Sequence, residues 1–373
     1  MKILHTIYDD FPNPWCGGGG ALRTLEISRR LADRHDITLL SGAYPNAPRT
    51  EEIDGLRILR VGSDWSYPLS RLSFSIQASR MVARSDFDLW VYHFSAYAPL
   101  LVPAHLRRRC LLECMHVLGD NAAQKFPLLG HGARLFETVT LRAYTEILTI
   151  SPTATREIEQ IVKHQNLHLV YTGVDALCFD APFSEEDYIL YFGRLDTYTK
   201  GLDILLKGFA RVCTHHLDIR LVLAGRGTPE RQQELQVMCE SLGILNRVTF
   251  VGPVSNEQKI ALFGASLFVC MPSRYEGWGI VAIEAGAAEK AVIGTDIAGL
   301  VDAIQHNKTG LLVAPENPEA LAQAMHHLLE HGDQRRRLGK AGREWARQFT
   351  WDHIARDQER VYFEVYEKIR SAK

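Results

Sequence analysis

The amino-acid sequence predicts an α/β protein with two doubly wound, Rossmann-like domains. Three observations support this fold class. The 373 residues exceed what one ordinary core accommodates. Short apolar runs alternate with amphipathic helical patterns along the chain, and a polar, proline-containing stretch at 173–188 interrupts the alternation. Because apolar strands alternating with helices form parallel sheets covered on both faces, we expect ligands beyond the carboxyl ends of the strands, in a cleft between the domains.

The predicted strands form two groups, one on each side of the polar break. The first group comprises 2–8, 36–42, 56–61, 88–94, 110–116, 146–151 and 168–174. The second comprises 188–195, 219–225, 248–254, 267–273, 291–296 and 310–315. Helical patterns lie between the strands, and a long helical run ends the chain. We therefore expect domains at 1–180 and 181–354, followed by a C-terminal helix at 355–373.

Composition excludes several classes of protein. The net charge is −2, so a nucleic-acid partner has no support. The seven cysteines form no CxxC pair, which predicts reduced thiols in a cytoplasmic protein. No apolar run approaches the roughly 20 residues of a spanning helix, and the first residues do not resemble a signal peptide.

A run of four glycines, Gly17 to Gly20, lies between the first strand and the first helix. Glycines there let the backbone approach a ligand closely, and a helix N-terminus favours an anion. The run matches neither GxGxxG nor GxxxxGK[ST], and a flexible loop is the alternative interpretation.

Two cations follow the first strand of the second half, in "YFGRLDTYTKGLDILLKGF". Arg194 comes directly after the strand, and Lys200 precedes a helix. Cations at the carboxyl end of a strand can bind a diphosphate and stabilise charge on a leaving phosphate. A solvated surface pair is the alternative.

Two glutamates stand eight positions apart in "SRYEGWGIVAIEAGA". Glu276 lies in the loop beyond a buried strand, where it is placed to bind hydroxyls of a group carried on a phosphate. Glu284 lies about one turn inside the next helix, where its carboxylate can accept ribose hydroxyls. Between them, the residues that carry the turn and expose amides to a phosphate are Gly277, Trp278, Gly279 and Ile280.

The stretch "PSRYEGWGIVAIEA" resembles the E-x7-E signature of family 4 glycosyltransferases, which have the GT-B fold. The resemblance continues in "LVLAGRGTPE", "FVGPVSNEQKIALFGASLFVCMPS", "SPTATREI" and "FTWDHIARDQERVY", and so spans nearly the whole chain. It implies a retaining transferase that uses a nucleotide-diphosphate sugar and no metal ion. The first domain would lie on the acceptor side, the second would bind the donor, and the final helix would cross back to the first.

The resemblance also implies roles for individual residues. Arg194 and Lys200 would contact the diphosphate, Glu284 the ribose and Glu276 the donor sugar. The glycine loop would approach the phosphate, and we favour Gly19 and Gly20 because four glycines stand where a pair is usual. "AAEKAV" also replaces the usual Gly-x-Pro after the signature helix.

The resemblance also implies a histidine close to the donor sugar and acceptor, near the carboxyl end of a first-half strand. His116 fits that place, and His93 competes for the role. Asp86 and Asp88 form a DxD, the metal signature of the other major glycosyltransferase fold. They precede a strand, at the end opposite the expected cleft, so we interpret them as surface loop. The histidine pairs 215–216 and 326–327 lack partners at zinc-site spacing, and no metal is expected.

The predicted reaction is transfer of a sugar from a UDP- or GDP-linked donor to a glycan, lipid-linked or small-molecule acceptor, with attack from the leaving-group face. Both glutamates are assigned to binding, so double displacement has no obvious nucleophile. A GT-B sugar-nucleotide epimerase and a non-catalytic nucleotide-sugar-binding module are the alternatives. The stretch 66–85 is interpreted as a helix packed on its own sheet, the alternative being a basic helix in peripheral contact with the inner face of a membrane.

Overall fold

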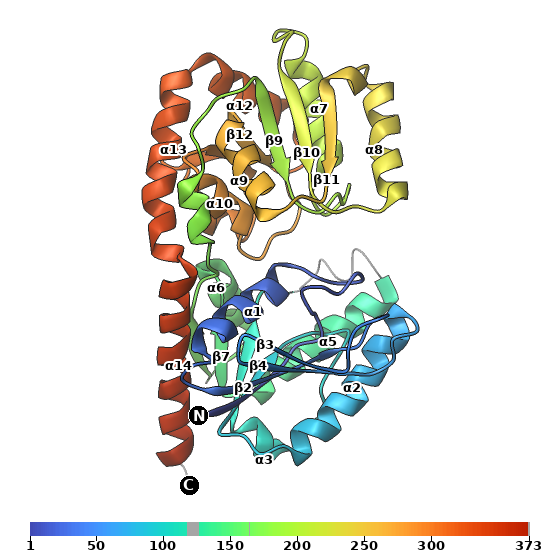
Figure 1. Cartoon of the computed structure of the whole chain (residues 1–373), viewed down its shortest axis with the longest axis vertical. Coiled ribbons are helices and arrows are strands. Elements are labelled where there is room, and N and C mark those ends of the chain that lie inside the picture. The colour runs from blue at the N-terminus through green and yellow to red at the C-terminus, as the bar shows by residue number, and fades with distance from the viewer. Residues whose placement is uncertain (118–126, 164, 372–373) are drawn as a thin grey trace. The chain divides into compact units, whose positions relative to one another are not determined.

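The computed structural model describes residues 1–117, 127–163 and 165–371 of the chain. These residues belong to two compact units, Met1–Thr172 with Trp351–Lys373, and Gly173–Thr350 (Figure 1). Each unit contains one sheet with helices between its strands. This arrangement confirms the predicted class of two Rossmann-like α/β domains.

The first unit contains an eight-stranded sheet in the order β3-β4-β2-β1-β5-β6-β7-β8. Its strands are β1 (Lys2–Thr6), β2 (Asp36–Gly42), β3 (Thr50–Ile53), β4 (Leu56–Val61), β5 (Leu89–His93), β6 (Cys110–Cys114), β7 (Glu146–Thr149) and β8 (Asn166–Leu169). Neighbouring strands are parallel except for the antiparallel pair β3 and β4.

Two strands of this sheet differ from the sequence prediction. Strand β3 was not predicted because its residues are mostly polar, although the Asp54-Gly55 turn after it, with φ values of 51° and 77°, is a hairpin signal. Strand β8 ends at Leu169, earlier than expected. The carbonyl of Val170 instead accepts a hydrogen bond from Arg23 at 3.1 Å.

The helices of the first unit cover its sheet and include the end of the chain. They are α1 (Gly19–Leu31), α2 (Tyr67–Arg84), α3 (Ala104–Arg107), α5 (Pro127–Ala143), α6 (Pro152–Ile161) and α14 (Trp351–Ser371). Helix α2 buries Phe74, Ala78 and Val82 in the core, which confirms that it packs on its own sheet. Helix α14 packs against α1, so the last segment of the chain returns to the first unit as expected.

The second unit contains a parallel six-stranded sheet in the order β11-β10-β9-β12-β13-β14. Its strands are β9 (Tyr188–Phe192), β10 (Arg220–Ala224), β11 (Val248–Gly252), β12 (Phe268–Met271), β13 (Ala291–Thr295) and β14 (Gly310–Val313). The chain moves outward from β9 in one direction, then returns to place β12 on the other side of β9. In doubly wound sheets this reversal marks the place where ligands bind.

The helices of the second unit are α7 (Leu202–Val212), α8 (Pro229–Ser241), α9 (Asn256–Ala265), α10 (Ile280–Ala287), α11 (Leu300–Ala303), α12 (Pro318–Glu330) and α13 (Gly332–Ala346). Apolar side chains of α7, α8 and α12 pack on the strands in one core that includes Leu205, Phe209, Leu235 and Met325. This core holds the strand ends, and the loops that follow them, in fixed positions.

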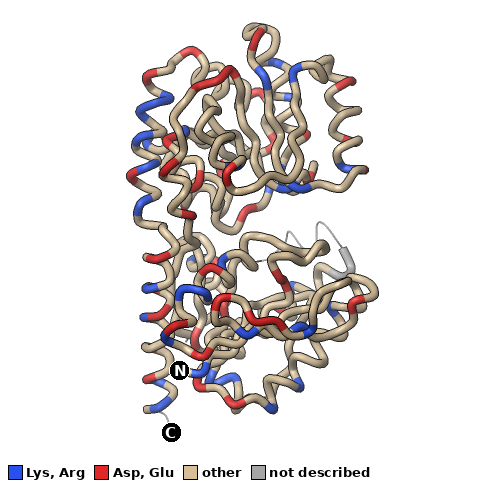
Figure 2. The backbone as a smooth tube through the Cα atoms, viewed as in Figure 1, with Lys and Arg blue, Asp and Glu red and all other residues tan. Residues whose placement is uncertain are grey.

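Charged residues of both signs are interspersed over both units (Figure 2). This distribution agrees with the near-zero net charge. Among the described helices, none combines the length and apolar character needed to cross a membrane.

Candidate functional site

The loop after β12 carries the first glutamate of the signature, and helix α10 carries the second. Gly279 has φ 80°, a left-handed conformation that favours glycine, and caps the start of α10. Its carbonyl accepts the Ala282 amide at 2.9 Å, which closes the first turn. Glu276 therefore lies beyond the carboxyl end of the strand and Glu284 in the second turn of the helix, as the sequence predicted.

Glu284 forms a buried ion pair that sequence reasoning missed. Its side chain is 7% exposed, and its Oε1 accepts a hydrogen bond from Lys259 Nζ at 2.8 Å. Burial by itself lowers the pKa of Lys259, but the neighbouring carboxylate raises it above the ordinary lysine value. Lys259 therefore stays charged, and no motif indicated it because it lies on α9, 25 residues before its partner.

Glu276 is paired in the same way, with Lys200. The two side chains are 17% and 20% exposed, and Nζ lies 2.6 Å from Oε2. The hydroxyl of Ser273 lies 3.5 Å from the same carboxylate oxygen. The structure thus brings together two of the residues predicted for the donor, one from the loop after β9 and one from the loop after β12.

These two loops are held together by backbone as well as side-chain contacts. Gly201 has φ 65°, and a Cβ there would lie 1.9 Å from the Pro272 carbonyl oxygen. The amide of Arg274 donates to the Thr199 carbonyl at 3.0 Å. Its guanidinium makes a two-pronged contact with Asp203, at 2.8 and 2.9 Å. Arg274 was not predicted, and it fixes the spacing of the Lys200 and Glu276 loops.

Arg194 directly follows β9, as expected, and its side chain is exposed. The Tyr191 hydroxyl donates to the Arg194 carbonyl at 2.7 Å. Gly193 and Gly225 approach each other so closely that a Cβ on Gly225 would lie 1.9 Å from the Gly193 carbonyl oxygen. The backbone at Arg194 is therefore fixed while its guanidinium faces solvent.

The groups at this edge are of the kinds that bind phosphates and hydroxyls, and their role in binding the donor stays a prediction. Arg194 and Lys200 supply cations after β9, and the amides that begin α10 add partial positive charge. Glu276 and Glu284 supply acceptors for hydroxyl groups. Since these residues flank the reversal between β9 and β12, they occupy the ligand position of a doubly wound sheet.

In the first unit, the glycine run forms the start of α1, with Gly18 as the cap and Gly19 as the first helical residue. A Cβ on Gly17 would lie 2.4 Å from the Phe11 carbonyl oxygen, and one on Gly20 would lie 2.6 Å from Met115 Sδ. Gly17 is therefore required by the packing of backbone atoms, whereas a side chain at Gly20 would displace only the end of the flexible Met115 side chain. Whether Gly19 and Gly20 contact a phosphate stays a prediction.

The two candidate histidines lie in different environments. His116 is exposed, two residues beyond the end of β6. His93 is the last residue of β5 and is 5% exposed. Its Nε2 lies 3.0 Å from His5 Nδ1 in the interior. This difference in exposure favours His116 over His93 for contact with a substrate, although a role for His116 stays a prediction.

A buried polar network connects α14 to the sheet of the first unit. Arg23 donates to Glu113 at 2.6 Å and to Gln358 of α14 at 2.8 Å. Tyr362, also on α14, lies 3.3 Å from His5 Nε2. Burial, assisted by nearby charge, lowers the pKa of His5 to about 3, so the imidazole is neutral. Burial alone would raise the pKa of Glu113, but the Arg23 charge lowers it to about 2.

The DxD residues lie at the amino end of the first sheet. The Asp86 carboxylate pairs with Lys2 Nζ at 2.7 Å, and Asp88 accepts the Lys2 amide at 2.8 Å just before β5 begins. This is the end of the strand opposite the carboxyl edge, and it agrees with their interpretation as a surface loop.

Comparisons with known proteins were made for the whole chain. Residues 18–173 match the family model described as glycosyl transferase 4-like domain, and residues 179–345 match glycosyl transferases group 1. An uncharacterized glycosyltransferase of Methanocaldococcus jannaschii is 25% identical over 393 aligned residues, covering 97% of this chain and 98% of that protein.

Solved structures are similar over the full length. Sucrose-phosphate synthase from Thermosynechococcus elongatus has a TM-score of 0.83 at 21% identity, covering 99% of this chain and 100% of the other. The Anabaena protein HepE, solved with UDP-glucose, has a TM-score of 0.72 at 17% identity and full coverage of both chains. These similarities show the fold.

Proposed function

Because the chain belongs to the family 4-type glycosyltransferases of GT-B fold, we propose that it transfers a sugar from a nucleotide-diphosphate sugar to an acceptor hydroxyl with retention of configuration. The observation that carries the proposal is the pair of lysine–glutamate contacts around Gly279, Lys200 with Glu276 and Lys259 with Glu284. Each glutamate of the signature is held by a cation at the ligand edge of the second sheet.

The donor is proposed to bind along this edge in three parts. The diphosphate lies against Arg194, Lys200 and the first amides of α10, from Ile280 onward, where cations and a helix N-terminus favour an anion. The ribose hydroxyls donate to Glu284. The transferred sugar donates hydroxyls to Glu276. The nucleotide and the transferred sugar are thus each bound by one glutamate, Glu284 and Glu276 respectively.

The two lysine–glutamate ion pairs respond differently when the donor binds. Lys200 Nζ donates a hydrogen bond to Glu276, so a diphosphate competes with the carboxylate for that cation. Ribose can use the remaining acceptor capacity of Glu284 while Lys259 holds Oε1. Lys259 therefore orients the Glu284 carboxylate and offsets its charge. Lys200 instead leaves the Glu276 carboxylate and binds the diphosphate of the donor.

The proposed chemistry needs no protein nucleophile. Glu276 and Glu284 are assigned to binding, so the acceptor attacks from the face of the leaving diphosphate, and a phosphate oxygen helps to remove its proton. Arg194 and Lys200 stabilise the charge that grows on that phosphate, the work that a metal ion does in other enzymes. Contacts of this type contribute roughly 10²–10³ in rate.

For the donor we propose a UDP- or GDP-linked hexose, and the UDP-glucose bound by HepE supports the former. A glycan, a lipid-linked sugar or a small molecule is proposed as acceptor. His116, exposed beyond β6, is proposed to hydrogen-bond a donor-sugar hydroxyl and align the anomeric carbon.

Product analysis tests the proposal. The full chain is incubated with UDP- and GDP-sugars, with and without a panel of acceptors and with excess chelator, and the products are read by NMR. We expect nucleoside diphosphate and a glycoside with the donor's anomeric configuration, formed only with acceptor. An altered sugar nucleotide without acceptor would indicate an epimerase, and no product with any donor would indicate a binding module. An inverted product, or activity restored by manganese after chelation, would contradict the retaining, metal-independent reaction.

A further inference from the structure

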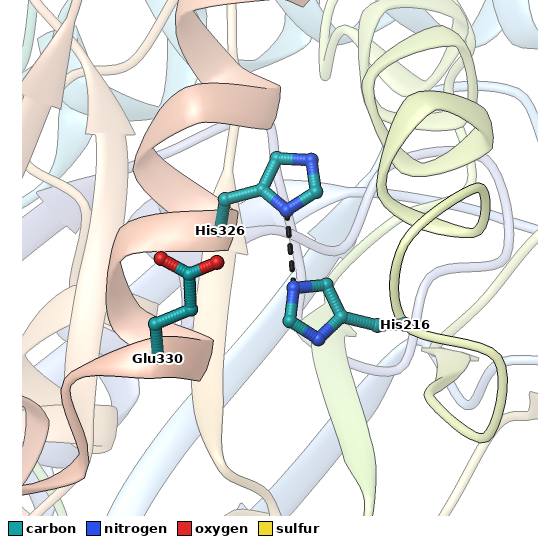
Figure 3. Close-up of side chains that lie close together, drawn as sticks. All are labelled: His216, His326 and Glu330. Atoms are coloured by element: carbon teal, nitrogen blue, oxygen red, sulfur yellow. Dashed lines mark hydrogen bonds between the residues drawn. The ribbon is translucent and has the colours of Figure 1, made fainter.

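Two histidines and a glutamate meet in the second unit, away from the residues assigned to the donor. The ligand atoms of His216, His326 and Glu330 all lie within 4.8 Å of one another. His216 Nε2 lies 3.1 Å from His326 Nδ1, and the Glu330 side chain extends from the same helix as His326 (Figure 3). Within the described part of the chain, this is the one group of three or more potential ligands close enough to hold a metal ion.

The fold fixes this group through a close crossing of α7 and α12. Gly208 permits the approach, because a Cβ there would lie 3.1 Å from the Pro318 carbonyl oxygen. After α7 ends, the amide of His216 donates to Val212 at 3.0 Å, and its carbonyl accepts from Arg247 at 3.1 Å. His216 is therefore held in place at its backbone.

The other two side chains are four residues apart on α12, and positions i and i+4 of a helix lie on one face. His326 is half-buried and Glu330 is exposed at the end of the helix. A glutamate in that position can change rotamer and bring a carboxylate oxygen toward the imidazoles without moving the backbone.

The distance between the imidazole nitrogens suits a shared ion. In the structure His216 Nε2 and His326 Nδ1 are hydrogen-bonded at 3.1 Å. With Zn–N bonds of about 2.0–2.1 Å, two tetrahedral ligands lie about 3.3 Å apart, so an ion can replace this hydrogen bond with little movement of the rings. Imidazole and carboxylate ligands together suit zinc and other divalent transition metals.

We propose that His216, His326 and Glu330 bind a divalent transition-metal ion of the zinc class, with water completing the coordination. Helix α7 separates this site from the donor loop, because Lys200 precedes its first turn and His216 follows its last. Its 11 residues span about 16 Å. The ion would fasten the end of α7 to α12 and would take no part in sugar transfer.

No motif indicates this site, because His216 and His326 are 110 residues apart in the chain. His326 meets both members of the first pair, with its ring centroid 5.3 Å from that of His215 and 5.1 Å from that of His216. The proposal departs from the sequence expectation that no metal binds at these histidines. It does not concern the transfer reaction, because the site lies away from the residues assigned to the donor.

Calorimetric titration of the metal-free full chain with Zn²⁺, in the presence of a weak competing chelator, tests the proposal. We expect one site per chain. His326→Gln should weaken it at least 100-fold, because even residues that only orient a ligand contribute 10–100-fold. Glu330→Gln should weaken it less. His331→Gln is the matched control, since that ring bonds to the His327 carbonyl at 2.9 Å and should leave the affinity unchanged.

Two further measurements separate this site from other ways of binding zinc. The Co²⁺-loaded chain should show no thiolate-to-metal charge-transfer band, which excludes the seven cysteines as ligands. The rise in melting temperature with Zn²⁺ should add to that with UDP, because the two sites are separate. Equal Zn²⁺ affinity in the wild type and His326→Gln, or a thiolate band, would overturn the proposal. Neither result would bear on sugar transfer.

Discussion

Replacing Glu276 by glutamine should tighten the binding of free nucleoside diphosphates. The Glu276 carboxylate lies 2.6 Å from Lys200 Nζ, and both side chains are about four-fifths buried. The substitution keeps the shape of the side chain but removes the charge that competes with a diphosphate for the lysine. A partly exposed ion pair is worth up to about 1 kcal/mol, which is roughly a fivefold gain in affinity.

The same substitution should have the opposite effect on the complete donor. The sugar hydroxyls are proposed to donate to the Glu276 carboxylate, and hydrogen bonds to a charged group contribute about 1.5–3 kcal/mol. The gain of about 1 kcal/mol at the diphosphate applies to the donor as well, so a UDP- or GDP-sugar should bind about 2- to 30-fold more weakly while UDP or GDP alone binds more tightly. Calorimetric titration with both kinds of ligand measures the two opposite changes in binding free energy that Glu276→Gln should cause.

Salt and a charge-matched control sharpen the test. The gain for UDP should shrink in 1 M salt, where the Debye length is about 3 Å. Glu240→Gln removes an equal charge from an exposed position near the end of α8 and should change neither affinity. If Glu276→Gln weakens UDP and GDP, or leaves both unchanged, the lysine does not exchange its carboxylate for phosphate and the reasoning fails.

Three other predictions concern the remaining site residues and the buried network. Glu284→Ala should weaken nucleoside diphosphates by about tenfold or more but affect a 2′,3′-dideoxy analogue less, and equal losses in calorimetry would show that the residue only shapes the helix. His116→Ala should leave UDP affinity within about twofold and cut transfer roughly 100-fold, whereas His93→Ala should chiefly lower the melting temperature; normal transfer by both would remove the histidine from the mechanism. The first unit should lose stability as pH falls from about 6.5 toward 3. In the unfolded chain His5 takes up a proton over this range, whereas the buried ring, with its lowered pKa, stays neutral. A free energy of unfolding in urea that does not change between these pH values would contradict this.

The residues that follow strands were predictable because strand periodicity is local. The apolar runs around β9 and β12 locate their carboxyl ends, and Arg194 and Glu276 lie in the loops that follow, two and five residues beyond those ends. Doubly wound topology then places both at the same edge of the sheet. The glycine at 279 was similarly readable, because a turn between strand and helix requires a positive φ.

The partners of these residues were not predictable, since they depend on tertiary packing. Lys259 reaches Glu284 because of the way α9 lies in the folded unit, and Arg274 reaches Asp203 across two loops. His216 and His326 meet because Gly208 lets two helices approach. The residues of each of these pairs lie too far apart in the chain for helix or strand periodicity to relate them.

The structure also explains how "AAEKAV" replaces the Gly-x-Pro that is usual after the signature helix, which the sequence alone did not reveal. Glu289 adopts a positive φ of 58° in place of the usual glycine-containing turn. Lys290 is buried, its Nζ donates to the Ser184 carbonyl at 3.1 Å, and burial lowers its pKa to about 8. The chain thus keeps the turn with a side chain that packs inward.

The central claim is that the carboxyl edge of the second sheet, at the reversal between β9 and β12, holds the nucleotide diphosphate. Hydrogen exchange of the full chain with and without UDP or GDP, read by mass spectrometry, tests it most directly. We expect protection at 193–201 and 273–284, with the strongest effect at the amides that begin α10. Protection confined to other segments, with these two loops unchanged by any nucleoside diphosphate that binds, would contradict the account.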